Sequence, residues 1–331
     1  MDLVQRLASV REQTLDRLIR VGLVAVVVGA AGAGAIYYLD RQADSGPSLR
    51  ERNISAAEDA VRQKPNSVAF RLQLADAYRA ANNSDSALEQ YEQVLKVDPG
   101  QRAGLLGRGE ILVSQGKLTE AAQSFNKVIG TSKGGEFAAV DPQLESAYYD
   151  LGSVALRQGG AKEAIVDLQR ALKVDPTDAD ALQLLGTAQL KAGAPARAVK
   201  AFRKVILLVP TDWCDPYSSL SDAYRALGRG PQAKYASAMG DFCEKKTDDA
   251  ESELKSLVSG PAAVDSMLGL GMIAEAKSDH ANAIRWYRRV LAADPSNSTA
   301  RIGLNRLGIA TRLKPQSAPA PAGHPSTGVA G

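Results

Sequence analysis

A repeat of about 34 residues is the feature that most restricts how this chain of 331 residues can fold. Four stretches show it most clearly: LADAYRAANNSDSALEQYEQVLKVDP ending at Pro99, LGSVALRQGGAKEAIVDLQRALKVDP ending at Pro176, LGTAQLKAGAPARAVKAFRKVILLVP ending at Pro210, and LGLGMIAEAKSDHANAIRWYRRVLAADP ending at Pro295. A unit of this size cannot bury its apolar face alone, so successive units must stack on one another.

Three positions mark each unit. The first is a small residue where two paired helices would touch, at Ala75, Gly109, Gly152, Gly186, Ser221 and Gly271, with separations of 34, 43, 34, 35 and 50 residues. The second is an alanine in the second helix, at Ala87, Ala121, Ala164, Ala198, Ala233 and Ala283. Four residues later comes a large residue, at Tyr91, Phe125, Leu168, Phe202 and Tyr287, whereas the fifth unit has Ser237. The fifth unit therefore departs most from the pattern.

This pattern resembles the tetratricopeptide repeat family. The resemblance implies an all-α, right-handed superhelical solenoid of about six helix pairs over residues 50–313, including capping helices at 50–64 and 298–313. The expected repeats lie near residues 68–99, 102–130, 145–176, 179–210, 214–246 and 264–295. The Gly-rich insertion at 130–142 is expected to be a loop. The insertion around DDAESELKSLVSGPAA lengthens the second helix of repeat five or forms a short extra helix.

Residues 21–39, VGLVAVVVGAAGAGAIYYL, contain no charge and as a helix would span about 28 Å, so they predict one transmembrane helix. A cleaved secretory signal is the alternative, because small residues occur at Ala31-Gly32-Ala33. Gly29 and Ala33 have a spacing that permits self-association of the span, although chance small residues explain it equally well. The apolar residues of segment 1–20 recur at helical spacing, residues 40–49 form a linker, and the Pro-, Ala- and Gly-rich tail 314–331 is expected to be disordered.

The arginines flanking the span favour one orientation. Arg6, Arg11, Arg17 and Arg20 precede it, and fewer basic residues follow closely. This bias places the N-terminus in the cytoplasm and the repeats on the extracytoplasmic, periplasmic side, with a cytoplasmic repeat domain as the alternative.

The resemblance implies that partner proteins or peptides bind the concave wall formed by the first helix of each repeat. Inward-pointing positions lie one and four residues after the small residue, and the polar candidates there are Asp76, Arg79, Glu110, Ser153, Thr187, Asp222, Arg225 and Glu275. The Lys and Asn residues with which some family members clamp a chaperone C-terminus are absent from these positions. In the repeated DAYRA stretches, Asp and Arg three residues apart either pair with each other or serve as charged contact sites for a bound peptide.

Composition argues against several other functions. The chain has only two histidines and no nucleophile, acid and base in motif reach, so no enzyme activity, catalytic residue or metal site is predicted. No haem-attachment, zinc or redox motif occurs, and no cofactor is expected. The net charge is +3 with acids and bases interleaved, which does not suggest nucleic-acid binding.

The two cysteines, Cys214 and Cys243, are expected at one end of repeat five. Asp215 is expected to cap the first helix with Pro216 at its first position, and antiparallel helices would bring Cys243 close. The cysteines form either a disulfide, which suits an extracytoplasmic domain, or two reduced thiols in a cytoplasmic one.

Together these features predict a membrane-anchored adaptor, similar to bacterial anchored tetratricopeptide proteins that serve as envelope chaperone partners or as accessory factors in cytochrome c maturation. Its expected role is to hold partner proteins during assembly of a membrane or envelope complex. The alternative is a constitutive structural subunit of a larger membrane complex.

Overall fold

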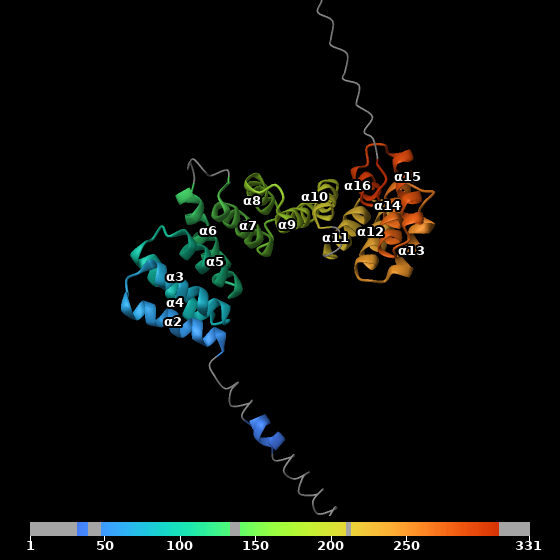
Figure 1. The fold of residues 1–331 in the computed structure, drawn as a ribbon. Helices are drawn as coiled ribbons and strands as arrows, with labels where there is room; N and C mark the ends of the chain where they lie inside the picture. Colours follow the sequence, from blue (N-terminus) through green and yellow to red (C-terminus); the bar gives the residue numbers. More distant parts are fainter. Residues whose placement is uncertain (1–31, 39–47, 133–139, 210–212, 311–331) are drawn as a thin grey trace, which may run out of the picture. The chain divides into compact units, whose positions relative to one another are not determined.

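The computed structural model describes residues 32–38, 48–132, 140–209 and 213–310. The chain divides into two compact units, Met1–Gly104 and Leu105–Gly331. All regular structure in the described ranges is helical (Figure 1). The all-α class and the helical-repeat array are therefore confirmed for the part of the chain that can be described.

The first unit contains three complete helices among its described residues. They are α2 (Leu49–Gln63), α3 (Val68–Ala80) and α4 (Ser84–Val97). Helix α2 begins with a capping box, in which the Ser48 side chain accepts from the Glu51 backbone and the Glu51 side chain accepts from the Ser48 backbone. Helix α3 packs against both α2 and α4, so α2 covers one side of the first helix pair.

The second unit continues the array. It contains most of α5 (Arg102–Ser114), and then α6 (Leu118–Ser132), α7 (Pro142–Arg157), α8 (Ala161–Val174), α9 (Ala179–Lys191), α10 (Pro195–Leu208), α11 (Asp215–Ala226), α12 (Gly230–Cys243), α13 (Thr247–Ser256), α14 (Ala263–Ala276), α15 (His280–Ala293) and α16 (Ser298–Arg306). Helix α9 packs against α8 and α10 and also contacts α7 and α11.

Large side chains of the second helices insert against glycines of the first helices. Phe202 and Leu168 are fully buried. A Cβ atom on Gly186 would lie 2.5 Å from a Phe202 ring atom, and one on Gly152 would lie 2.6 Å from Leu168 Cγ. Because real Cβ contacts are not this short, glycine is required at these crossings. The marker residues of the sequence pattern therefore form the buried core of the helix pairs other than that of repeat five.

Repeat five differs because an extra helix follows it. Helix α12 ends at Cys243, and α13 is a separate helix that packs against α12 and α14. The second of the two readings for this insertion, a short extra helix, is the correct one. Ser237 is exposed on α12, while Tyr235 and Met239 are buried. Tyr235 and Met239, on other sides of α12, thus provide the buried side-chain volume that Ser237 does not.

Two helix ends differ from expectation. Asp215 is not the cap of α11 but its first residue, with Cys214 at the cap position and no capping side chain; the Trp213 indole donates to the Asp215 carboxylate instead. Helix α16 ends at Arg306, well before residue 313, because Gly308 adopts the left-handed conformation at φ 78° that ends the helix.

Most of the predicted transmembrane segment 21–39 lies outside the described residues. Residues 32–38 are helical and exposed. Within the described ranges, none of the helices combines the length and the apolar character that a bilayer crossing requires. Segment 1–20, residues 40–47 of the predicted linker, residues 133–139 of the predicted 130–142 loop and the tail 314–331 also fall outside the description. Residues 130–132 are not loop but the end of α6, and Pro142 begins α7.

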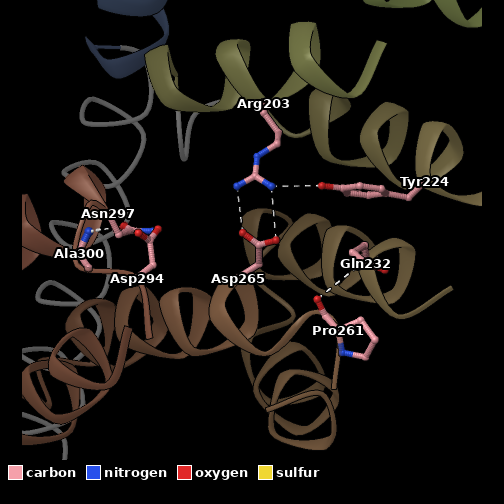
Figure 2. A network of polar contacts seen from close by, with 8 residues as sticks. All are labelled: Arg203, Tyr224, Gln232, Pro261, Asp265, Asp294, Asn297 and Ala300. Carbon is pink, nitrogen blue, oxygen red and sulfur yellow. Dashed lines mark hydrogen bonds and ion pairs between the residues drawn. The ribbon is translucent and has the colours of Figure 1, made fainter. Parts of the chain in front are cut away.

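A polar contact ties repeats four, five and six together. Arg203 on α10 donates to both carboxylate oxygens of Asp265 on α14, at 3.0 and 3.4 Å, and to the Tyr224 hydroxyl on α11 at 3.3 Å (Figure 2). Burial alone would lower the pKa of Arg203, but the Asp265 carboxylate holds that pKa above its ordinary value. The guanidinium therefore stays charged and acts as a cross-repeat clamp.

This clamp is expected to contribute about 1 kcal/mol of coupling energy, because both partners are partly solvated. A double-mutant cycle with Arg203→Met and Asp265→Ala measures it from urea unfolding of the full chain. The exposed pair Asp222 and Arg225, at 2.6 Å on one helix, is the control and should give less than about 0.5 kcal/mol. Equal coupling in both pairs would contradict a specific clamp.

Candidate partner-binding face

The candidate partner-binding face is the side of the first helices that carries the polar residues predicted from the sequence. Asp76 accepts the Tyr91 hydroxyl at 2.6 Å and has the Arg79 guanidinium at 3.8 Å. Asp222 accepts from Arg225 at 2.6 Å, and both side chains are exposed. In both DAYRA stretches, therefore, Asp and Arg pair on their own helix while remaining accessible to solvent.

The other predicted residues have different surroundings. Thr187 donates to the backbone oxygen of Gln183 at 3.0 Å, and Ser153 is half-buried. Glu275 accepts the Tyr287 hydroxyl at 2.8 Å and an Arg306 nitrogen at 2.7 Å. Because α16 supplies Arg306, the closing helix already engages Glu275. The sequence pattern of a single repeat could not reveal this contact.

The structure adds a group of carboxyls that the sequence reasoning missed. We call it the acidic band: Glu110 on α5, Glu145 and Asp150 on α7, and Asp178 and Asp180 at the start of α9. Across neighbouring first helices, Asp150 interacts electrostatically with Glu110 and Glu145 with Asp178, while Asp180 acts on Tyr149 of α7. Asp150 lies three residues, about one helical turn, before Ser153, so helical spacing could have placed it beside the predicted positions.

The acidic band is electrostatically strained. Burial and the negative charge of Glu110 raise the pKa of Asp150 to about 7. Burial and a hydrogen bond with Asp178, reinforced by the charges of Asp178, Asp175 and Asp150, raise the pKa of Glu145 to about 7. Every one of these causes raises the pKa, so a nearby cation would stabilise the ionised form of both carboxyls.

The raised pKa values predict that the array loses stability as pH rises. Because Asp150 and Glu145 hold protons in the folded chain up to about pH 7 and lose them near pH 4 when unfolded, folding takes up protons in this window. The free energy of unfolding should therefore fall between pH 5 and pH 8, on the order of 1–2 kcal/mol after solvent screening.

Urea unfolding at both pH values checks this prediction. The double variant Asp150→Asn and Glu145→Gln should lose most of the pH dependence. Variant Asp249→Asn, at an exposed position on α13, is the control and should keep it. A wild-type chain that gained stability between pH 5 and pH 8 would contradict the assignment.

A second feature of the same face lies in repeat five. Cys214 and Cys243 are joined by a disulfide with a Cα–Cα distance of 5.6 Å, which links the start of α11 to the end of α12. Beside it lies a pocket of about 180 Å³, whose lining includes Asp222, Arg225 and the exposed Ser237. The small residue at position 237 leaves this pocket open.

Among the described residues, no group of three or more His, Cys, Asp or Glu side chains is placed to hold a metal ion. Tyr149 lies beside the acidic band, and burial together with the neighbouring carboxylates raises the pKa of Tyr149.

Comparison with known proteins supports the repeat assignment. The family model described as "Tetratricopeptide repeat" matches residues 72–136, 149–212 and 245–298, which is more than half of the chain. The match leaves out α11 and α12, the helices of the divergent fifth repeat.

Curated relatives match parts of the chain. Superkiller protein 3 of Schizosaccharomyces pombe is 26% identical over 184 residues, covering 55% of this chain and 13% of its own length. Human DnaJ homolog subfamily C member 3 is 28% identical over 181 residues, covering 53% and 36%. Cellulose synthase operon protein C of Escherichia coli strain K12 is 28% identical over 221 residues, covering 62% and 18%. The chain thus spans only 13 to 36% of the length of these relatives.

Solved structures show similar arrays. MamA is 26% identical with a TM-score of 0.48, over 55% of this chain and 93% of MamA. YrrB, described as a TPR protein with an unusual peptide-binding site, is 20% identical with a TM-score of 0.49, over 60% of this chain and 98% of YrrB. Both TM-scores are below 0.5, so neither likeness carries an argument about function.

Proposed function

Because the chain belongs to the tetratricopeptide repeat family, we propose that it is a membrane-anchored scaffold that holds partner proteins through its first-helix face. Proteins of this family are generally protein–protein interaction scaffolds and typically not enzymes. The proposed role is to recruit partners during assembly of a membrane or envelope complex.

The acidic band is the observation that carries this proposal. Glu145 and Asp150 are carboxyls whose pKa values are raised to about 7 by burial and by neighbouring carboxyls. A lysine or arginine side chain of a partner would neutralise the band and lower both pKa values. The preferred partner segment is therefore basic, and its binding should strengthen as pH rises from 5 to 8.

Membrane anchoring through residues 21–39 is part of the proposal. Support comes from the uncharged length of this segment and from the arginines that precede it. The disulfide between Cys214 and Cys243 fits an extracytoplasmic, oxidising compartment. Maleimide labelling of unreduced protein in freshly isolated membranes tests this placement: absence of free thiols is expected, and two free thiols would place the array in the cytoplasm.

Crosslinking and mass spectrometry in native membranes tests the scaffold function. Wild-type protein should crosslink to partner proteins, and the double variant Glu110→Gln and Asp150→Asn should lose most of these crosslinks. The double variant Glu92→Gln and Asp249→Asn removes two exposed charges elsewhere and should keep them. Crosslinks that persist at wild-type yield in the acidic-band variant would refute this face as the binding surface.

A constitutive structural subunit remains the second candidate function, because a permanently occupied face would show the same charges. Purification in mild detergent separates the two. A scaffold should co-purify with several partners in substoichiometric amounts, whereas a constitutive subunit should co-migrate with one complex in fixed stoichiometry.

A further inference from the structure

A groove of about 480 Å³ lies between α2 and α3 in the first unit. Five alanines form most of its lining: Ala56, Ala57 and Ala60 on α2, and Ala77 and Ala80 on α3. Polar residues complete the lining, namely Arg50 and Asn53 on α2, and Gln73 and Asp76 on α3. No residue of α2 is buried. The groove is therefore lined mainly by small apolar residues and is open to solvent.

The repeat array itself shows what fits such a groove. In the second unit, α7 packs against α8 and also contacts α9. A first helix thus lies against its own second helix and the first helix of the next repeat. Helix α2 precedes α3 in the same way that the second helix of one repeat precedes the first helix of the next repeat. The groove between α2 and α3 is accordingly the place of a first helix that the described chain does not supply.

Ala57 gives the groove a specific shape. In repeats with a terminal proline, the large residue of the second helix stands eight positions before it, as Phe202 does before Pro210. Pro65 follows α2, and the residue eight positions before it is Ala57. The side chain that would normally press against a glycine is missing here. A helix that docks in this groove must supply the bulk itself.

The described residues that precede α2 do not fill the groove. Ile36, Tyr37 and Tyr38 lie in the helical stretch 32–38 and are 62 to 71% exposed. If residues 21–39 span a membrane, segment 1–20 lies on its opposite side and cannot reach the array. The C-terminal end of the array differs, because α16 packs against α14 and α15. A hollow of similar volume near that end is lined by α15 alone and not by two helices.

We propose that this groove docks an amphipathic helix of a partner protein, with a large apolar residue at its centre where the first helices of this array carry a small residue, most often glycine. The docked helix continues the array's established helix–helix interface, with polar flanks beside Arg50 and Asp76. This inference rests on the proposed scaffold function and names the kind of partner segment that the N-terminal end would hold.

Two peptides of 16 residues test the groove. One has the sequence of α7, PQLESAYYDLGSVALR, and the other carries Gly152→Phe within that sequence; a side-chain lactam on the solvent side keeps both helical. Fluorescence anisotropy measures their binding to the full chain in detergent. The phenylalanine peptide should bind wild-type chain about tenfold more tightly than the glycine peptide, because only it fills the space beside Ala57.

Variant Ala57→Phe restores the large residue and should reverse this preference. It should reject the phenylalanine peptide and favour the glycine peptide, an outcome that loss of folding cannot produce. Failure of the phenylalanine peptide to saturate binding to wild-type chain at up to about 1 mM would overturn the proposal, as would an unchanged preference in Ala57→Phe. The two tests can fail independently. The scaffold test changes Glu110 and Asp150, which lie in the other compact unit, and it is read out by crosslinking and not by peptide binding.

Discussion

Substitution Phe202→Ala is expected to lower the free energy of unfolding of the Leu105–Gly331 unit by about 3–5 kcal/mol. The Phe202 side chain is fully buried, and its ring lies against Gly186 on the neighbouring first helix. Alanine would lose the apolar transfer energy of the ring and leave a cavity at the crossing of α9 and α10. Urea unfolding followed by circular dichroism measures the loss.

A matched control lies on the same helix. Leu207 is 60% exposed on α10, so Leu207→Ala should cost less than about 0.5 kcal/mol. The crossing also predicts non-additivity. Gly186→Ala should destabilise the wild-type chain, because its Cβ would lie 2.5 Å from the ring, yet be tolerated in the Phe202→Ala background. Additive effects of the two substitutions would show that the ring and the glycine do not share this space.

Much of the fold could be predicted from the sequence because the information is local and repeated. The contact of Gly186 with Phe202, and that of Gly152 with Leu168, recur with the same spacing in unit after unit. The extra helix α13 was also indicated by a short stretch of sequence, although the sequence alone left two interpretations of that stretch open. Periodicity is strong wherever one helix packs on its sequence neighbour.

The contacts of the candidate partner-binding face could be predicted only in part because they join different repeats. The charge of Glu110 on α5 helps to raise the pKa of Asp150, and Asp178 at the start of α9 helps to raise the pKa of Glu145. No position within a single repeat indicates that two carboxyls of neighbouring units will meet. Glu275 illustrates the same difficulty, since its partner Arg306 lies 31 residues away on α16. Such pairings depend on the stacking of helices, which the spacing of one unit does not specify.

The position of a helix end depends on which hydrogen bonds the nearby side chains make, and the repeat pattern of the sequence does not show these bonds. Asp215 has the residue type of a helix cap and stands before Pro216, yet its carboxylate accepts from the Trp213 indole and the helix starts at Asp215 itself. The exposed Ser237 is a different case. Its departure from the family pattern was visible in the sequence, but its consequence, a pocket beside the disulfide, required the arrangement of α11 and α12.

Removal of the disulfide is expected to lower the free energy of unfolding by about 3–4 kcal/mol on the chain-entropy model. The bridge closes a loop between residues 29 positions apart and spans repeat five, where the large crossing residue is absent. The double variant Cys214→Ser and Cys243→Ser, compared with oxidised wild-type chain by urea unfolding, measures the effect. Reduction of the wild-type chain should reproduce it, whereas reductant should leave the double variant unchanged.

Removal of the disulfide should affect repeat five more than the acidic band. The acidic band lies on α5, α7 and α9, and the bridge joins α11 to α12. Because repeat arrays are stabilised mainly by nearest-neighbour contacts, loss of the bridge should loosen repeat five and the flanking α10 and α14 more than α7. Amide hydrogen exchange should therefore quicken most in α11 and α12 and least in α7. Uniformly faster exchange across the second unit would instead mean that the bridge stabilises the whole array.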